Sequence, residues 1–501
     1  MPTSNVSPTL DGLFQRILAR QPDALALVDP INKSRITGHA PRRLTFAQAD
    51  RAISALAAHF VEAGLPINAV IGVQLPNTVE FMLTLLAAHR AGLIVALLPQ
   101  LWRQAELTAA LNRTGARAIV TMSKIDGVSH ADLAMNAAAE AFSIRHVCGF
   151  GEDLPEGMAS LDLAMTSESS TDRIVVQDGR KAALISFDVT ADGLRAVPRT
   201  HLNLIAGGLA VFLESRMPQG ARVMSAFAPA SFAGLTASLL LWLLSGGTLA
   251  LHHPFDGEAL GRQINAEACD TLVAPAPMAL RLNEVDMTAR VPSLRHVIGL
   301  WRMPEQIASS AQWTAEQARF TDVYLFGEVG LFGARRTADG MPVPIMPGPH
   351  GAPRDIPGTS IAGETLLTPK GTLALRGPMV TVAAYAPPTP PMGSLTAPPP
   401  PPDYADTGYA ARLDRSSGAL CITSPPSGIV AVGGYRFLSQ DLQEWAKRLG
   451  QGALLTALPD RLCGYRLAGR AQDNARGREA LNQLGLNPLM AEAFRDRTII
   501  G

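Results

Sequence analysis

Residues 420–437 read LCITSPPSGIVAVGGYRF, and they carry the clearest structural signal in this 501-residue chain. Its short apolar runs are separated by Pro425 and Pro426, and the last of them contains the glycine pair Gly433 and Gly434. Proline and glycine between short apolar runs indicate strands joined by turns. The residues that follow, SQDLQEWAKRL, have the spacing of a helix. We therefore expect a small α+β lobe over residues 414–501, preceded by a larger domain over residues 1–413.

Upstream of this lobe, strand and helix patterns alternate. From Leu44 the segment LTFAQADRAISALAAHFVEAG has helical spacing, with Thr45 as the expected N-cap and Gln48 three residues later. A short apolar run (AVIGVQL), a helical pattern (VEFMLTLLAAHRAG) and a second apolar run (LIVALLP) follow. Strands are then expected at 117–122, 182–187 and 248–252, and helices at 201–214 and 233–244. The predicted fold class is α/β, with a large multi-layer N-terminal α/β domain and a small C-terminal lobe.

The charge balance limits the classes of partner. Lys plus Arg number 43 and Asp plus Glu also number 43, and charged residues make up only 17% of the chain. Such a composition lacks the basic excess that binds nucleic acid or an anionic membrane surface. The sequence therefore predicts no nucleic-acid partner and favours a small, partly apolar ligand.

The cysteines and the apolar segments predict the cellular compartment of the protein and whether it crosses a membrane. Cys148, Cys269, Cys421 and Cys463 are widely scattered, with no C-x-x-C spacing and no clustered His, so no metal site is predicted. Free thiols favour a reducing cytosol, and the expected localisation is cytoplasmic. The most apolar stretch, residues 235–251, is interrupted by serine, threonine and glycine, so we expect a buried helix that leads into a strand and no membrane span.

Four segments resemble one family. Leu75-Pro76-Asn77 precedes a helix that ends at Ala91-Gly92, residues 199–204 read RTHLNL, and residues 371–378 read GTLALRGP. Residues 420–437 align without a gap to the pattern L-x-I-T-G-R-x-x-D-x-I-K-V-G-G-Y-R-V. The chain thus resembles the adenylate-forming superfamily of acyl-CoA synthetases, luciferases and non-ribosomal adenylation domains. The resemblance implies an AMP-binding-like large domain and a mobile small lobe, with a cleft between them for ATP, a carboxylic acid and a thiol acceptor.

The phosphate-binding loop of the family is degenerate here. Its pattern T-S-G-T-T-G-x-P-K-G corresponds to residues 188–196, DVTADGLRA, where Gly193 is the only glycine and Asp188 would face a polyanion. Thr190 and Gly193 are candidate nucleotide contacts, and Arg195 is a candidate replacement for the missing lysine. An ordinary strand–helix turn is the alternative interpretation.

The metal-binding and ribose-binding motifs are also altered. In the aromatic-Gly-x-Thr-Glu turn, residues 326–330 read FGEVG, so Gly327 remains a candidate nucleotide contact while the final Glu is lost. Glu328 is the candidate substitute for Mg²⁺ binding or catalysis, or else a solvated surface carboxylate. In the T-G-D turn, Thr407 remains as a candidate contact, and Tyr409 replaces the Asp that accepts the ribose hydroxyls. A phenol can make one such bond, so Tyr409 is a further candidate nucleotide contact, although it carries no charge at neutral pH and its bulk could fill the nucleotide site.

The small lobe lacks the charges of its family pattern. Pro425, Gly428 and Ala431 stand where the resemblance places Arg, Asp and Lys, and no P-x-T-x-x-G-K pattern closes the chain. Gly433 and Gly434 remain, either for pantetheine contact or for a tight strand turn.

A pocket for the acyl group is expected from two segments. The helices around residues 230–244 and a turn at residues 299–301 surround the carboxylic substrate in the family, which makes Phe232, Gly234 and Trp301 candidate pocket residues. Phe232 and Trp301 have plain core residues as the alternative. A fatty or aryl acid is expected rather than an amino acid.

The sequence therefore predicts an acyl-CoA synthetase-like protein that has lost adenylation chemistry, a pseudoenzyme that binds an acyl or aryl carboxylic acid or a partner. The partner would be a carrier protein or an active synthetase. The alternative is a divergent carboxylic acid–CoA ligase that forms an acyl-adenylate with the relocated groups Glu328, Arg195 and Asp406. Only this alternative requires ATP and Mg²⁺. A gene product drifting toward loss of function is a third interpretation.

Overall fold

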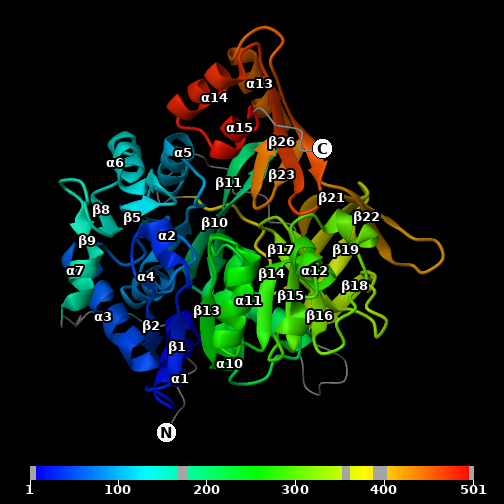
Figure 1. The fold of residues 1–501 in the computed structure, drawn as a ribbon, viewed down its shortest axis with the longest axis horizontal. Coiled ribbons are helices and arrows are strands. Elements are labelled where there is room, and N and C mark those ends of the chain that lie inside the picture. Colours follow the sequence, from blue (N-terminus) through cyan, green and yellow to red (C-terminus); the bar gives the residue numbers. More distant parts are fainter. Residues whose placement is uncertain (1–6, 168–174, 176–177, 352–360, 387–402, 496–501) are drawn as a thin grey trace, which may run out of the picture.

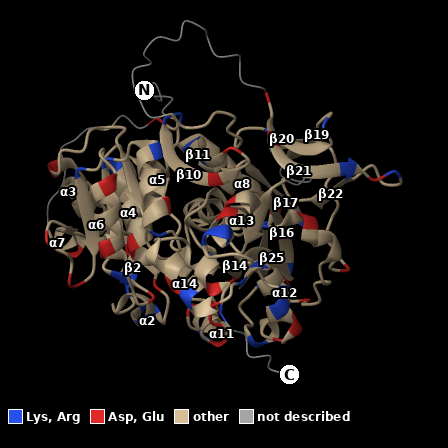
Figure 2. Cartoon of the chain, turned by 90° about the horizontal axis from the view of Figure 1, so that it is seen from above, with Lys and Arg blue, Asp and Glu red and all other residues tan. Residues whose placement is uncertain are grey.

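The computed structural model describes residues 7–167, 175, 178–351, 361–386 and 403–495. Two large mixed sheets, each mostly parallel, form the body of the molecule, and the C-terminal elements lie together on one side of it (Figure 1). Acidic and basic residues are interspersed over the elements (Figure 2). No helix of the described residues has both the length and the apolar character needed to cross a membrane.

The first sheet has eight strands, parallel except at its two edges, where β2 and β17 run antiparallel to their neighbours. In spatial order its strands are β17 (Gly330–Arg335), β16 (Arg319–Phe326), β15 (His296–Trp301), β14 (Thr271–Pro275), β12 (Arg222–Ser225), β13 (Thr248–Leu251), β1 (Leu25–Val28) and β2 (Arg43–Thr45). The second sheet has seven strands, of which only β11 is antiparallel to its neighbour. Its order is β11 (Gly193–Thr200), β10 (Ala182–Thr190), β4 (Ile94–Leu97), β3 (Val70–Val73), β5 (Ala118–Met122), β8 (His146–Phe150) and β9 (Ala159–Ser160). A short hairpin pairs β6 (Lys124–Ile125) with β7 (Val128–Ser129).

Helices separate the parallel strands, as the alternating pattern predicts. They are α1 (Leu10–Leu18), α2 (Lys33–Thr37), α3 (Phe46–Glu62), α4 (Val79–Arg90), α5 (Gln104–Thr114), α6 (His130–Glu140), α7 (Leu161–Thr166), α8 (His201–Glu214), α9 (Phe232–Leu235), α10 (Leu241–Ser245), α11 (Gly257–Ala266) and α12 (Ala276–Glu284). The 3₁₀ turns η2 (Thr288–Arg290) and η3 (Pro304–Ser309) follow. The predicted capping box of α3 is confirmed, because the Thr45 hydroxyl accepts from the Gln48 N–H and the Gln48 side chain accepts from the Thr45 N–H.

Two expected elements differ from the prediction. The helix expected at residues 233–244 contains a π-helical segment, η1 (Thr236–Leu240), between α9 and α10. The hydroxyl of Thr236 donates to the Ala233 carbonyl and that of Ser238 to the Gly234 carbonyl, and such bonds compete with the regular ladder. The expected turn at residues 299–301 is the end of strand β15, where Gly299 pairs with Asp322.

A third sheet leads into the small lobe. It contains β18 (Gly348–Gly351), β19 (Ile361–Leu367), β20 (Thr372–Arg376), β21 (Ala405–Leu413) and β22 (Leu420–Ser424), all antiparallel. The predicted join near residue 413 therefore falls in the turn between two paired strands, and the division at residues 413 and 414 stays a prediction. The remaining elements are β23 (Ile429–Val432), β24 (Tyr435–Leu438), α13 (Ser439–Arg448), β25 (Leu454–Asp460), β26 (Gly464–Arg470), α14 (Asn474–Gln483) and α15 (Pro488–Glu492).

The C-terminal elements have a core of their own and also contact the large sheets. Their apolar core includes Leu442, Leu467 and Phe494. The Leu101 N–H donates to the Tyr435 hydroxyl over 3.0 Å, and the Asn487 N–H donates to Glu106 Oε1 over 2.9 Å. The loop after β4 and the start of α5 are thereby bonded to the small lobe.

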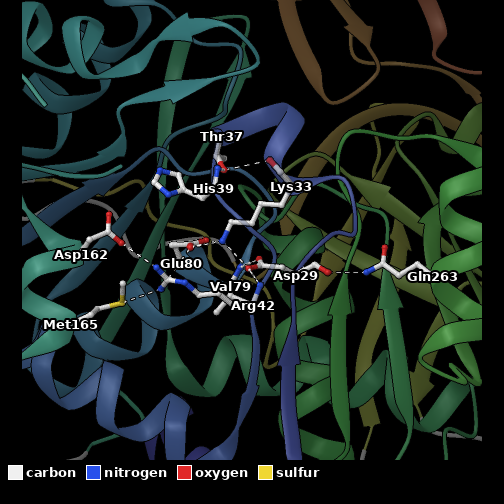
Figure 3. Close-up of polar contacts among 10 residues, drawn as sticks. All are labelled: Asp29, Lys33, Thr37, His39, Arg42, Val79, Glu80, Asp162, Met165 and Gln263. Carbon is white, nitrogen blue, oxygen red and sulfur yellow. Dashed lines mark hydrogen bonds and ion pairs between the residues drawn. The ribbon is translucent and has the colours of Figure 1, made fainter. Parts of the chain in front are cut away.

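A buried charge network joins β1, α2 and α4 (Figure 3). Lys33 Nζ lies 2.7 Å from Asp29 Oδ2 and 2.5 Å from Glu80 Oε1, and all three side chains are almost completely buried. The other oxygen of Asp29 accepts from the Val79 N–H at the start of α4. Burial and the nearby Glu80 raise the pKa of Asp29 to about 6 in spite of Lys33. Burial also acts to raise the pKa of Glu80, but Lys33 outweighs it and lowers that pKa. Because Lys33 is shared by two carboxylates, it is the residue on which this network depends.

A pair of buried histidines predicts that the protein is sensitive to acid. The rings of His89 and His201 lie 4.8 Å apart, and burial lowers their pKa values to about 4 and about 2. The unfolded chain binds protons at these sites near pH 6.5 while the folded chain does not, so their contribution to stability is present above pH 6.5 and is lost as the pH falls toward 4. We expect the free energy of unfolding to fall by about 2 kcal/mol per histidine between pH 7 and pH 5. Urea unfolding at the two pH values measures this, and an equal slope in the variant His89→Gln would contradict it.

Candidate functional site

A central cavity of about 370 Å³ lies between the two large sheets and the C-terminal elements. Its walls come from the loops after β3, β4, β12, β15 and β16 and from the turn between β23 and β24. Clefts at the carboxyl ends of parallel strands are the usual ligand sites of α/β sheets. The residues that line it include Leu75, Asn77, Trp102, Asp126, Phe187, Asp188, Phe227, Arg302, Glu328, Tyr435 and Arg436.

A second cavity of about 360 Å³ adjoins the first. The two cavities share Asp188, Val189, Glu328 and Arg436 among their lining residues, so these residues form the wall between them. The second cavity brings together several residues that the sequence singled out. These are Thr190, Arg195, Asp406, Thr407 and Glu328, whereas Gly327 lines the central cavity.

An ion pair between strands β10 and β24 is the main feature of this wall. Arg436 Nη1 of the small lobe lies 2.8 Å from Asp188 Oδ1, and Arg436 Nη2 donates to the Tyr409 hydroxyl over 2.8 Å. The second oxygen of Asp188 accepts from the Glu328 N–H over 3.0 Å. Burial acts to lower the pKa of Arg436, but Asp188 and Tyr409 outweigh it and raise that pKa. The guanidinium at this wall is therefore a charged group already neutralised by the protein.

Tyr409 is a core residue with an occupied hydroxyl. Its side chain is 1% exposed and packs edge-on against Phe326 with ring centroids 5.6 Å apart. Burial raises its pKa to about 12, so the phenol is neutral. Its hydroxyl contacts Arg436 and the Arg302 carbonyl and does not replace the charge of the expected aspartate. Thr407, two residues earlier, donates to the Leu373 carbonyl.

Glu328 is buried, so the interpretation as a solvated surface carboxylate is wrong. Its Oε2 accepts from the Phe232 N–H over 2.9 Å, and burial raises its pKa to about 7 although Ser186 and Arg199 favour the charged form. This burial depends on residues distant in sequence, which sequence spacing does not reveal. Among the described residues no group of three or more His, Cys, Asp or Glu could hold a metal ion. Oε2 of Glu328 is thus bonded to a backbone N–H, and the described residues place no cluster of metal-ligating side chains around it.

Residues 188–196 form a β-hairpin, so the interpretation as a strand–helix turn is wrong. They belong to the hairpin of β10 and β11, in which Asp188 pairs with Arg195 and Thr190 with Gly193. The Thr190 hydroxyl donates to the Gly193 carbonyl, and Arg195 Nη2 donates to the Val382 carbonyl over 2.8 Å. Of these residues only Ala191 and Asp192, at the tip of the hairpin, lie outside the β-ladder.

The expected acyl-pocket residues lie behind the wall of the central cavity and not along it. Phe232 is fully buried, with the Arg199 guanidinium 3.6 Å from its ring centroid. Trp301 Nε1 donates to Asp322 Oδ1 over 2.7 Å. Gly234 lies so close to the Ala228 carbonyl that a Cβ would come within 2.2 Å of its oxygen. Phe232 and Trp301 are buried and do not line this cavity, whose apolar wall comes from residues such as Trp102, Phe187 and Phe227.

Two arginines of the site were not predicted. Arg436 stands inside the stretch 420–437, and its position beside the glycine pair was the available signal. Arg302 directly follows β15, and its guanidinium lies 4.0 Å from the ring centroid of Phe227. Burial lowers the pKa of Arg302 to about 10, which leaves it charged at neutral pH.

The comparison with known families agrees with this geometry. The model of the family described as AMP-binding enzyme matches residues 14–381. This chain belongs to that family. Among curated relatives of this AMP-binding chain, the medium-chain fatty-acid–CoA ligase of Escherichia coli (strain K12) is 24% identical over 314 residues, which are 61% of this chain and 53% of the relative. The salicyl-AMP ligase / salicyl-S-ArCP synthetase of Mycobacterium tuberculosis is 24% identical over 305 residues, 61% of this chain and 49% of the relative. The chain thus spans about half the length of the curated relatives it matches.

Solved structures show the same fold. The amide bond synthetase McbA from Marinactinospora thermotolerans has a TM-score of 0.68 at 18% identity, over 95% of this chain and 94% of that one. A Brucella canis acyl-CoA synthetase has a TM-score of 0.64 at 19% identity, over 96% of this chain and 89% of that one. The predicted α/β fold of acyl-CoA synthetases and adenylation domains is therefore confirmed.

Proposed function

We propose that this AMP-binding family member binds an acyl or aryl carboxylic acid, or a partner, without adenylating the acid. The observation that carries the proposal is the Asp188–Arg436–Tyr409 network. In this network the positive charge of Arg436 is already paired with the carboxylate of Asp188, so it is not free to face a phosphate. Adenylation joins two anions, and it needs cations that are free to face the phosphates.

The charges around the second cavity support this proposal. Asp188, Glu328 and Asp406 line it, against the cations Arg195 and Arg436. Arg436 is paired with Asp188, and Arg195 donates to a backbone carbonyl. A triphosphate placed there would face more negative than available positive charge, which disfavours its binding.

The proposal predicts no adenylation by the purified full chain. With ATP, Mg²⁺ and a panel of fatty and aryl acids, we expect AMP formation at least about 10³-fold slower than for an active enzyme of the family, because each missing charge-stabilising donor lowers the rate about 10²- to 10³-fold. Release of AMP and pyrophosphate is the measurement. AMP formation that depends on a carboxylic acid would contradict the proposal.

A divergent carboxylic acid–CoA ligase is the second candidate. It is favoured by one observation, which is that Thr190, Arg195, Glu328 and Thr407 line the same cavity. In that case ATP and Mg²⁺ would be its cosubstrate and metal, and the acyl-adenylate would form beside these groups. Calorimetry with ATP–Mg²⁺ at millimolar concentration distinguishes the two candidates, since this one requires heat of binding.

The proposal extends to the partner, the compartment and the domain division. A carrier protein or an active synthetase is the proposed macromolecular partner, supported by the carrier-linked name of the Mycobacterium tuberculosis relative. A cytoplasmic setting is supported by four free cysteines. A small lobe over residues 414–501 with its own apolar core would present the surface for such a partner.

A further inference from the structure

We propose that Arg302 binds the carboxylate group of a small organic acid in the central cavity, in the absence of ATP. This inference rests on the proposed function, because an acid that is not adenylated keeps its negative charge. The site would hold the acid by its charged end, with the apolar body of the acid against the wall formed by Phe187 and Phe227.

The position of the Arg302 guanidinium favours ligand binding. It lines the central cavity, and Phe227 supports one side of it at 4.0 Å from the ring centroid. Gly434 of the small lobe lies on another side, where a Cβ would come within 2.8 Å of the guanidinium carbon. The guanidinium is thus held between an aromatic ring and a glycine. Such support orients its planar set of N–H donors before any ligand arrives.

Among the described residues, Arg302 differs from other interior arginines in having neither an ion pair nor a hydrogen-bond acceptor for its guanidinium. The buried Arg199 also lacks an ion pair, but its guanidinium donates to the Met379 and Glu328 carbonyls. Arg336 is paired with Asp322, Arg90 with Asp11, and Arg436 with Asp188. Within the part of the chain that the structure describes, the Arg302 guanidinium makes no ion pair and no hydrogen bond. A partly buried cation without a counter-charge is costly to the folded protein, and an anionic ligand would relieve that cost.

The surroundings favour one carboxylate over a phosphate. Asp126, Asp188 and Glu328 also line the cavity, and Arg436 is already neutralised by Asp188. A dianionic phosphate would have one free cation and two further acidic groups near it, whereas a monoanion needs only Arg302. A guanidinium binds a carboxylate through two parallel N–H donors, and the aromatic wall suits an apolar acid. A volume of about 370 Å³ admits a small acid.

Calorimetry on the full chain at pH 7 without nucleotide tests this inference, with benzoate and octanoate as probes. Benzamide and octanamide are the matched neutral compounds, and inorganic phosphate is the competing anion. We expect saturable binding of at least one acid, with its amide bound at least about tenfold more weakly, because hydrogen bonds to a charged group contribute strongly. This comparison needs no variant and therefore does not depend on how a substitution folds.

Variants then assign the effect to Arg302. Arg302→Gln should weaken acid binding about 10- to 100-fold and leave amide binding unchanged, and Arg302→Lys should retain part of the affinity. Arg262→Gln is the matched control, since Arg262 is an exposed arginine paired with Glu258 on α11. Equal binding of acids and amides, full affinity in Arg302→Gln, tighter binding of phosphate, or no saturable binding of any acid would each overturn the inference. AMP release on addition of ATP–Mg²⁺ would instead overturn the proposed function, whichever result Arg302→Gln gives.

Discussion

Replacing Lys33 with methionine is expected to lower the free energy of unfolding by about 3–5 kcal/mol, because it leaves two buried carboxylates without their cation. Lys33 Nζ contacts both Asp29 and Glu80, and among the described residues no other cationic group lies as close to either carboxylate. The nearest alternative is Arg42, 3.9 Å from Glu80 and partly exposed. Chemical unfolding at pH 7, monitored by circular dichroism, measures the loss.

Two comparisons make this prediction specific to the buried network. Arg262→Met removes an exposed ion pair and should change stability little. The triple variant Asp29→Asn, Lys33→Met and Glu80→Gln removes all three charges and should recover much of the stability, since uncharged replacements of buried ion pairs are often tolerated. A Lys33→Met protein as stable as the unaltered chain would show that water or Arg42 compensates the carboxylates.

Replacing Arg436 with glutamine is expected to weaken the docking of the small lobe by about 3–5 kcal/mol, because Asp188 then lies buried without its cation. The Asp188 side chain is 8% exposed and that of Arg436 is 15% exposed, so solvent replaces only part of the lost interaction. Hydrogen exchange at the Leu101 and Asn487 amides, which bond across the lobes, is the measurement, and it should become faster.

The double variant Asp188→Asn and Arg436→Gln is the matched control for this prediction. In this double variant no buried Asp188 carboxylate lacks a cation. The hydrogen-exchange rates of the Leu101 and Asn487 amides should therefore return most of the way toward those of the unaltered chain. If the single variant Arg436→Gln exchanges as slowly as the unaltered chain, then the ion pair does not hold the lobes together.

The sequence predicts the elements of this fold better than its site. Thr45 and Gln48 specify a helix start through local hydrogen bonds, and the alternation of patterns specifies parallel layers, so both predictions are confirmed. The burial of Glu328 and the pairing of Asp188 with Arg436 depend on tertiary contacts, the latter between residues 248 positions apart. The local sequence around each of these residues does not indicate such contacts. Tertiary contacts also explain why Trp301 lies in the core although the next residue, Arg302, lines the central cavity.

The wall between the two cavities has a mechanical consequence. Asp188, on strand β10, forms one side of this wall, and Arg436, on strand β24 of the C-terminal elements, forms the other side. If the C-terminal elements move away from the two large sheets, Arg436 leaves this wall, and the two cavities join where it stood. We therefore expect ligand binding in either cavity to depend on the position of the C-terminal elements.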